Sequence, residues 1–485
     1  MTDVATGRGQ HPAALRRSGE LTRAVLAAQA ASPSSRLSWV VLLYLFAVVV
    51  PLGLQVGPLV MTSLRALLLV LLIPLMVKLL MGRLGGLLLT DVLFVLHILW
   101  ATVALGVNNP SQVVQQVGST GIEFLGGYLV GRAYVRTPEA FAATCRALAL
   151  MVCCILPFAL LESLTFRPIL IEILRSTGVA AVSAVDEGTR MGMRRAQATF
   201  AHPILYGLFC SVAFSLAFVA LTGIVSTTRR YVTAVMIACA GFLSLSSGAL
   251  LAIALQVALI AWSTALASVK GRWWFLVGLF ALAYVLIDAL SNRAPLQVFM
   301  SYATFSAHNA YYRNVIFEWG MVNVWSSPVF GIGLKDWIRP RWMGSASVDN
   351  FWLLMAMRYG IPGFLLLALG YALAVAQIMR RDFHDNVQLT LFRRAWVFTF
   401  LGLSFTLCTV HIWTNVYSFV FFMLGAGMWM IRVPSDAGAT PPEAPPDRPG
   451  SGEPPPSASA RPPSPYTRFP GVPRGGALEP ALRTR

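Results

Sequence analysis

A polar pair, Asp349 and Asn350, stands between a long polar segment and an apolar run that begins at Phe351. A carboxylate in that position can accept a proton from an attacking hydroxyl group. Asp has an ordinary pKa near 3.9 against about 6.5 for His, so it is the weaker base unless burial raises its pKa. Asp and Asn are also preferred N-caps, which stabilise a helix by about 1 kcal/mol. Both interpretations stay open for Asp349, and Asn350 can take the cap while Asp349 acts as a base.

Arginine side chains are concentrated in two long polar segments, 165–201 and 291–349. A guanidinium group can bind two phosphate oxygens at once, so a basic surface of this kind suits a phosphate-bearing ligand. Arg194, Arg195 and Arg313 are the candidates to bind such an anion. The alternative is that long translocated loops simply tolerate these charges.

Arg358 is unusual because it lies within the apolar run that follows Asn350. Charges inside a membrane segment are costly, so they usually serve a function or pair with another charge. Arg358 can bind phosphate from inside the helix bundle or extend to the membrane interface. If the helix starts at Asp349, a rotation of about 100° per residue places Arg358 roughly opposite Asp349, and the two do not line one small site. Glu123 and Arg65 pose the same question, and for them we expect pairing between helices.

The surrounding sequence predicts helices that lie in a membrane. Of the 485 residues, 56% are hydrophobic and only 12% are charged, and the mean hydropathy is +0.67. Apolar runs of about 20 residues, long enough to cross a bilayer as helices, recur along the chain. We therefore predict an all-α fold, a polytopic membrane helical bundle with about twelve transmembrane helices. The predicted spans are 38–57, 61–81, 89–106, 119–135, 144–164, 202–223, 231–246, 248–268, 272–290, 350–378, 394–411 and 413–431.

The chain divides into three parts: a polar N-terminal tail (1–37), a membrane domain (38–432) and a C-terminal tail (433–485). The C-terminal tail holds 15 of the 29 prolines and is predicted to be disordered. Lys and Arg occur in the short connections on one side of the predicted bundle and are absent from those on the other side. This bias places both termini in the cytoplasm. With that orientation, 291–349 is a large outer loop between the ninth and tenth spans.

The net charge of +17 is explained by the membrane topology and the two arginine-containing segments, so nucleic acid is not an expected partner. All six cysteines fall in apolar stretches, and the six histidines are scattered without a pair at helical spacing. The sequence therefore predicts no disulfide framework, no metal site and no cofactor.

The spacing around Asp349 resembles the signature of the O-antigen ligase and polymerase family of bacterial inner-membrane proteins. That signature is a His followed by Asn, Ser or Gln, then nine residues, then Gly-x-x-Gly. Here Asp349-Asn350 is followed by nine residues and by Gly360-Ile-Pro-Gly363, so only the His is replaced. His308-Asn309 is a substitute by residue type, but the next glycine, Gly320, lies one residue beyond the required spacing.

Two further segments are similar to the family and keep its order. Arg313-Asn-Val-Ile-Phe, followed by Ser327-Pro-Val-Phe-Gly-Ile-Gly333, resembles an Arg-led helix and a Ser-Pro-x-x-Gly-x-Gly turn. Arg195-Ala-Gln-Ala-Thr-Phe-Ala-His-Pro203 resembles an Arg…Phe-x-x-Pro segment. The resemblance covers roughly 190–365 by motif and 38–432 by span pattern. One basic residue is missing, because the family's helix-borne Ser-Arg-Gly is Ser246-Ser247-Gly248 here.

The resemblance implies a metal-independent transferase that moves a glycan from a polyprenyl diphosphate carrier to an acceptor hydroxyl on the periplasmic face of the inner membrane. The implied partners are polyprenyl-diphosphate-linked oligosaccharide, an acceptor glycan or glycolipid, membrane lipids and other polysaccharide assembly proteins. The implied catalytic residues are Asp349 and Arg313, and the implied substrate-binding residues are Arg194, Arg195, Asn350 and Arg358. The Asp in place of His favours a polymerase of exopolysaccharide or O-antigen over a ligase.

Two other classes of protein compete with this interpretation. A multi-pass transporter is consistent with twelve spans, but it predicts internal repeats with broken helices at corresponding positions in the two halves. No repeat relates 38–230 to 231–432, and one large loop on one side favours a one-sided site. A non-catalytic scaffold for polysaccharide export is the third class, if the replaced residues abolish catalysis.

Overall fold

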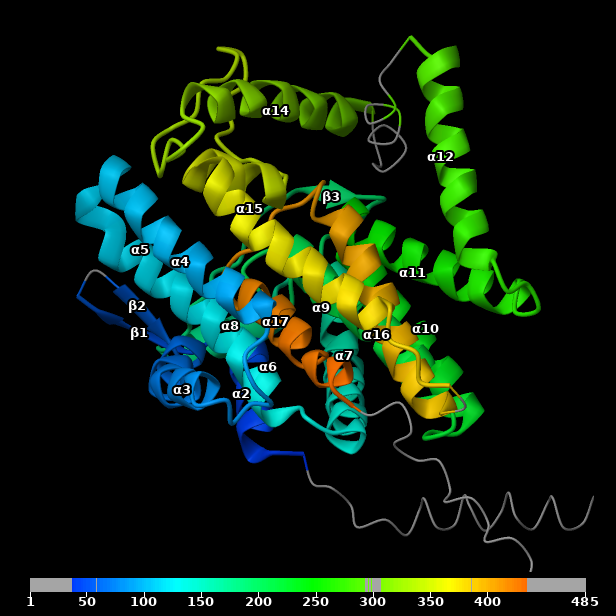
Figure 1. Ribbon diagram of the computed structural model, residues 1–485. Coiled ribbons are helices and arrows are strands. Elements are labelled where there is room, and N and C mark those ends of the chain that lie inside the picture. The colour runs from blue at the N-terminus through cyan, green and yellow to red at the C-terminus, as the bar shows by residue number, and fades with distance from the viewer. Residues whose placement is uncertain are drawn as a thin grey trace, which may run out of the picture. The chain divides into compact units, whose positions relative to one another are not determined.

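Helices form most of the described chain and nearly all of its regular secondary structure, in agreement with the all-α prediction (Figure 1). The computed structural model describes residues 37–57, 59–292, 295, 298, 307–384 and 386–433. Most of both predicted tails, 1–37 and 433–485, and the side chains of His308 and Asn309 lie outside the described residues. The α-helices, in chain order, are α2 (Trp39–Val49), α3 (Ser63–Leu80), α4 (Leu89–Asn108), α5 (Val113–Gly121), α6 (Gly127–Tyr134), α7 (Pro138–Thr165), α8 (Ile169–Ser176), α9 (Pro203–Ser215), α10 (Thr227–Leu243), α11 (Ser247–Ala265), α12 (Arg272–Leu290), α14 (Ala307–Ser326), α15 (Phe351–Met379), α16 (Val387–Thr406) and α17 (Thr414–Gly425).

Eight helical segments of the described chain are long and apolar enough to cross a membrane. They are α3, α4, α7, α9 with the π-helical turn η3 (Leu216–Ala220), α11, α12, α15, and α17 with the short helix η4 (Met428–Ile431). The other four predicted spans coincide with α2, α10, α16 and the run formed by α5, the π-helical turn η2 (Ile122–Gly126) and α6, which fall short in length or hydropathy. By length and composition these helices are consistent with a polytopic membrane protein.

The first predicted span, 38–57, is wrong at its C-terminal end, because helix α2 stops at Val49. Pro51 has no N–H group and disfavours helical backbone at the residue before it. The chain turns there into a short antiparallel ribbon, and a second ribbon lies within 165–201. In the described part of the chain the strands are β1 (Gly53–Val56), β2 (Leu59–Thr62), β3 (Thr189–Arg190) and β4 (Met193–Arg194).

Small residues allow helices α6 and α17 to pack backbone against backbone. A Cβ atom added to Gly131 would lie 2.1 Å from the carbonyl oxygen of Phe422. One added to Gly425 would lie 2.1 Å from that of Tyr128. Close approach at small residues is a common way to join helices within a bilayer.

Glu123 and Arg65 pair between helices, as expected. Arg65 on α3 donates its Nε–H to Glu123 Oε1 on η2 over 2.8 Å. A second pair, which the sequence did not predict, joins Arg132 to Asp91 over 3.0 Å with both side chains buried. The Tyr128 hydroxyl also donates to this carboxylate, over 2.5 Å. The two pairs tie α3 to η2 and α4 to α6.

Helix α15 is interrupted at Gly360, where φ is 71° and ψ is 177°. Pro362 follows and has no N–H to donate to the carbonyl oxygen of Arg358, four residues before it. The turn over 327–333 supplies the missing donor, because Gly333 donates its backbone N–H to that oxygen over 3.2 Å. The turn over 327–333 and the break in α15 therefore dock on each other through their backbones.

Helix α4 holds the opposite side of the same turn. The Asn108 side-chain amide donates to the carbonyl oxygens of Phe330, over 3.2 Å, and Gly331, over 3.1 Å. The side-chain oxygen of Asn109 accepts the backbone N–H of Leu334 over 2.8 Å. The turn is thus fixed between α4 and α15, and it fixes the backbone that carries Arg358.

Candidate active site

Three arginines from two segments of the chain face one cavity of about 410 Å³, which we call the arginine cavity. Arg190 lies on β3, Arg195 directly follows β4, and Arg313 lies on α14. Two carboxylates, Glu187 and Asp349, share the lining. The polar lining also includes His202, Ser246, Ser247, Tyr312, Ser345 and Ser347. The cavity is therefore walled by more positive than negative side chains and suits an anionic ligand.

Arg195 is the most buried of the three arginines, and Glu187 holds it in place. Its Nη1 donates to Glu187 Oε2 over 3.0 Å, and its side chain is only 4% exposed. Burial and then the charge of Arg190 lower the pKa of Arg195 to about 10, against the opposing effect of Glu187 and Asp349. The guanidinium group therefore remains charged at neutral pH.

Arg313 keeps unused hydrogen-bonding capacity at the cavity wall. Its Nη2 donates to the Ser247 hydroxyl over 3.4 Å, while its Nη1 is buried and has no hydrogen-bond partner among the described residues. Burial lowers the pKa of Arg313; the nearby Asp349 carboxylate opposes this shift and Arg190 adds to it. An unsatisfied guanidinium nitrogen beside a cavity is suited to an incoming anion.

The structure separates the two roles that the sequence left open for the polar pair. Asn350 is the N-cap of α15, and its side-chain oxygen accepts the backbone N–H of Leu353 over 3.0 Å. Asp349 is half-buried and does not cap the helix. One of its carboxylate oxygens, Oδ1, accepts the Ser347 hydroxyl over 2.9 Å. The Asp349 carboxylate is thus available for another contact.

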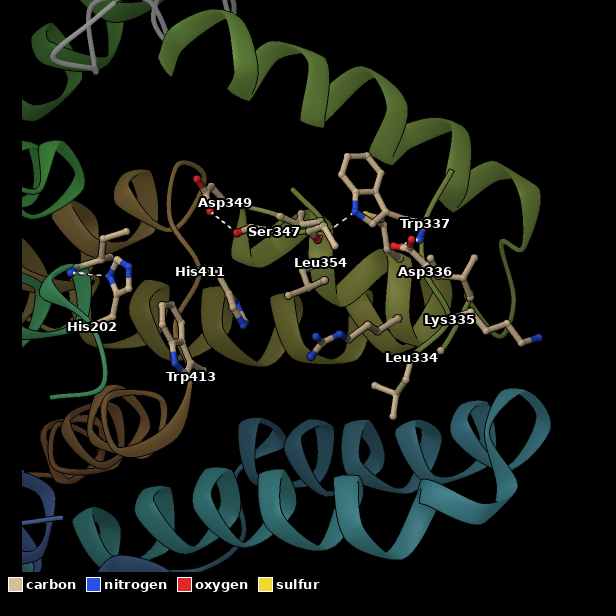
Figure 2. Close-up of a pocket in the computed structure, with 17 residues that line it drawn as sticks. His202, Leu334, Lys335, Asp336, Trp337, Ser347, Asp349, Leu354, His411 and Trp413 are labelled. Carbon is tan, nitrogen blue, oxygen red and sulfur yellow. Dashed lines mark hydrogen bonds between the residues drawn. The ribbon is translucent and has the colours of Figure 1, made fainter. Parts of the chain in front are cut away.

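A second cavity, of about 580 Å³, also has Asp349 in its lining, and we call it the Arg358 cavity. Figure 2 shows Asp349 beside Ser347, with His411 and Trp413 contributed by another segment. Its polar and aromatic lining residues are His202, Lys335, Asp336, Trp337, Ser347, Asp349, Arg358, His411 and Trp413. Asp349, His202 and Ser347 line both cavities, so the two cavities meet at these side chains.

The prediction that Asp349 and Arg358 do not line one site is wrong. It assumed that the helix starts at Asp349, whereas α15 begins at Phe351 and Asp349 precedes its cap. The direction of the Asp349 side chain is therefore not set by helical rotation. Both residues line the Arg358 cavity.

His202 is held between a helix terminus and a carboxylate. Its Nδ1 accepts the backbone N–H of Ile204 over 3.1 Å and caps α9. Its Nε2 lies 3.0 Å from Glu187 Oε1, so this nitrogen carries the proton in the neutral ring. Burial lowers the pKa of His202, with Glu187 opposing the shift. Because both ring nitrogens are engaged, His202 orients Glu187 and is not free to accept a substrate proton.

Arg194 lies apart from the other predicted site residues. Its guanidinium donates to the carbonyl oxygens of Phe166, over 3.3 Å, and Val185, over 3.1 Å. It is absent from the linings of both cavities. Arg194 thus holds the 165–201 segment together, while Arg195, the next residue, faces the arginine cavity.

Sequence reasoning missed Arg190, Glu187 and His202 as cavity residues. The available signal was the dense charge between 186 and 195, together with a His that immediately precedes the Pro203 helix start. Within the described residues, no group of three or more His, Cys, Asp or Glu side chains could hold a metal ion.

Comparison with known proteins adds no family. No protein-family model and no curated protein matches this chain. The chemistry is therefore argued from the cavities. A carboxylate between an arginine-lined cavity and a polar cavity can take a proton while a negative charge develops beside the arginines.

Proposed function

We propose that this chain is a glycosyltransferase of the bacterial inner membrane that polymerises polyprenyl-diphosphate-linked oligosaccharide units on the periplasmic face. Its product in this proposal is a surface polysaccharide, an exopolysaccharide or O-antigen. The observation that carries the proposal is the position of Asp349, which lines both the arginine cavity and the Arg358 cavity. One cavity offers a place for a diphosphate and the other a place for an acceptor sugar.

The proposed reaction replaces one bond at the anomeric carbon of the lipid-linked sugar. The acceptor hydroxyl oxygen forms a new bond to that carbon, and the bond between the carbon and the diphosphate oxygen breaks. Asp349 takes the hydroxyl proton, and the lipid diphosphate leaves with the bonding electron pair. Arg190, Arg195 and Arg313 stabilise the charge that grows on the leaving group.

In this proposal Arg190 replaces a basic residue that the family has and this chain lacks. The position of the missing arginine is Ser247, and the Ser247 hydroxyl lies in the arginine cavity, 3.4 Å from Nη2 of Arg313. Arg190 lines the same cavity from strand β3 and is fixed by a 2.8 Å hydrogen bond to the Leu245 carbonyl. In this proposal a guanidinium from the 165–201 segment takes the place of one from α11.

The transporter alternative is less well supported. It requires broken helices at corresponding positions in two halves of the chain. Among the described helices, only α15 contains a residue with non-helical backbone angles. The two cavities also share one set of side chains, as expected of a site where two substrates meet.

The experiment that tests the proposal removes the proton acceptor and keeps its shape. A strain lacking the gene is complemented with wild type or Asp349→Asn at matched membrane levels. We expect Asp349→Asn to abolish long polymer and to accumulate the lipid-linked unit. Asp186→Asn is the control, because Asp186 is an exposed carboxylate that lines neither cavity. Normal polymer in the Asp349→Asn strain would refute the assignment of the base.

A second variant tests the leaving-group site. Arg313→Lys keeps the charge but loses the planar fork that binds two oxygens. We expect a loss of polymer of at least tenfold, whereas Arg341→Lys, at an exposed arginine outside both cavities, should behave as wild type. Equal polymer from both variants would show that Arg313 is only a solvated charge.

A further inference from the structure

The Arg358 cavity contains a guanidinium group that has no partner among the described residues. We infer that this cavity binds an acceptor glycan bearing an anionic substituent, a carboxylate or a phosphate, and that Arg358 pairs with that anion. The inference rests on the proposed function, because it treats the cavity as the acceptor side of the same transfer site. It adds the chemical class of the acceptor, which the proposed reaction leaves open.

Arg358 is half-buried, and its side chain makes no hydrogen bond or ion pair with any described residue. The three arginines of the arginine cavity, in contrast, each donate to a carboxylate, carbonyl or hydroxyl acceptor. None of its guanidinium nitrogens is among the buried polar atoms without a partner, so they face the open cavity and can donate to an incoming anion. A neutral glycan offers only uncharged oxygen atoms, which are weaker acceptors for a charged donor.

The remaining charges of the cavity leave room for an anion. Asp336 is already paired with Arg339 Nη1 over 2.5 Å and is mostly exposed. Lys335 adds a second positive charge, and its Nζ lies 3.4 Å from the side-chain oxygen of Asn108. Asp349 is at the junction with the arginine cavity, where the attacking hydroxyl is placed. Arg358 and Lys335 therefore set the charge of the part of this cavity that is not shared with the arginine cavity.

Two further features fit a polar ligand with sugar rings. His411 Nδ1 is buried with no hydrogen-bond partner among the described residues, and His411 lines this cavity. Trp337 and Trp413 line it too, and indole rings pack against the apolar faces of sugars. The backbone around Arg358 is fixed by the turn over 327–333, so the guanidinium is presented from a rigid element.

The test measures binding to the purified full chain in detergent by calorimetry, without any lipid-linked donor. The three probes are a tetrasaccharide containing glucuronate, its carboxyl-reduced neutral counterpart, and the neutral tetrasaccharide carrying one phosphomonoester. The variants are Arg358→Gln, which removes the charge, Arg358→Lys, which keeps it, and Arg341→Gln as the matched control. Arg341 is an exposed arginine of the preceding 291–349 segment and lines neither cavity.

We expect wild type and Arg341→Gln to bind at least one anionic probe ten- to a hundredfold more tightly than the neutral probe. Arg358→Gln should lose that preference, and Arg358→Lys should retain part of it. Preference for the glucuronate probe identifies a carboxylate, and preference for the phosphorylated probe identifies a phosphate. Equal binding of all three probes to wild type, or no binding of either anionic probe, overturns the inference. The result is independent of polymer formation, so loss of the proposed function would be seen separately in the Asp349→Asn strain.

Discussion

The backbone N–H of Ile361 donates a hydrogen bond of 2.7 Å to the carbonyl oxygen of Pro328. In an unbroken helix this N–H would bond to Met357, four residues earlier. Because Ile361 turns away, the Met357 carbonyl is free and accepts the N–H of Ile332 over 2.7 Å. Three backbone groups that the break in α15 releases, the N–H of Ile361 and the carbonyls of Met357 and Arg358, all bond to the turn over 327–333. The break is thus a built element of the site and not a local distortion.

Gly360 is the residue on which this break depends. Its φ of 71° is unfavourable for any residue with a side chain, and an added Cβ would lie 2.1 Å from the Val329 carbonyl oxygen. We expect Gly360→Ala to destabilise the protein by about 1–3 kcal/mol or more, measured by thermal unfolding in detergent. Gly344→Ala is the control, because an added Cβ there meets nothing within 4 Å. Equal unfolding temperatures for the two variants would contradict the role of Gly360.

The proposed exchange of arginine positions can be tested by reversing it. Arg190→Gln removes one charge from the arginine cavity, and we expect polymer yield to fall at least tenfold. Adding Ser247→Arg to that variant places a guanidinium where the family resemblance has one, so yield should recover in part. Polymer yield and accumulated lipid-linked unit are measured together. No loss in Arg190→Gln would remove Arg190 from the site.

The buried pair of Asp91 and Arg132 supports the bundle away from the cavities. Asp91→Asn leaves the Arg132 guanidinium buried without a counter-charge, because the two side chains are 0% and 2% exposed. We expect a loss of about 3–5 kcal/mol in the free energy of unfolding. Glu172→Gln breaks the exposed pair with Arg167 and should cost less than about 1 kcal/mol. Comparable losses in both variants would show that burial does not matter here.

His411 predicts a dependence of stability on pH. Burial, reinforced by the charge of Arg358, lowers the pKa of His411 to about 3. The unfolded chain, with a His pKa of about 6.5, therefore binds one more proton than the native protein between about pH 3 and pH 6.5. Stability due to this group is full above pH 6.5 and is lost as the pH falls through that window.

The measurement compares denaturant unfolding in detergent at pH 7 and pH 5. We expect wild type to lose about 1–2 kcal/mol more than His411→Gln between these values, because carboxylates titrate alike in both proteins and cancel. His384→Gln, at an exposed histidine, should lose as much as wild type. Identical losses in wild type and His411→Gln would contradict the low pKa.

The helices could be predicted because apolar runs of bilayer length leave few other structures for the backbone. The end of α2 was misplaced because the hydrophobic run continues past Pro51, whereas the helix ends before this proline. The pairing of Arg65 with Glu123 followed from the cost of isolated charges in a membrane. The pairing of Asp91 with Arg132 obeys the same rule, but sequence offers no way to tell which distant charge is the partner.

The candidate site was predicted in part. Asp349, Arg195 and Arg313, three of the predicted site residues, do line one cavity. Arg190 was not singled out, since its approach to Arg313 depends on how the 165–201 segment folds over α11. Arg358 was assigned to the helix face opposite Asp349 because the helix was assumed to start at Asp349, whereas it starts at Phe351. Contacts between distant segments and the first residue of a helix are what pattern reasoning resolves least.

The turn over 327–333 is bound by Asn108 and Asn109 on one side and by the backbone of α15 on the other. These three pieces are distant in sequence but cannot be exchanged separately. A chimaera that transplants the long loop of another protein onto this bundle must also carry the matching end of α4 and the matching break in α15. Acceptor preference, if set in this loop, would therefore be inherited as a block of three segments and not acquired by loop swapping alone.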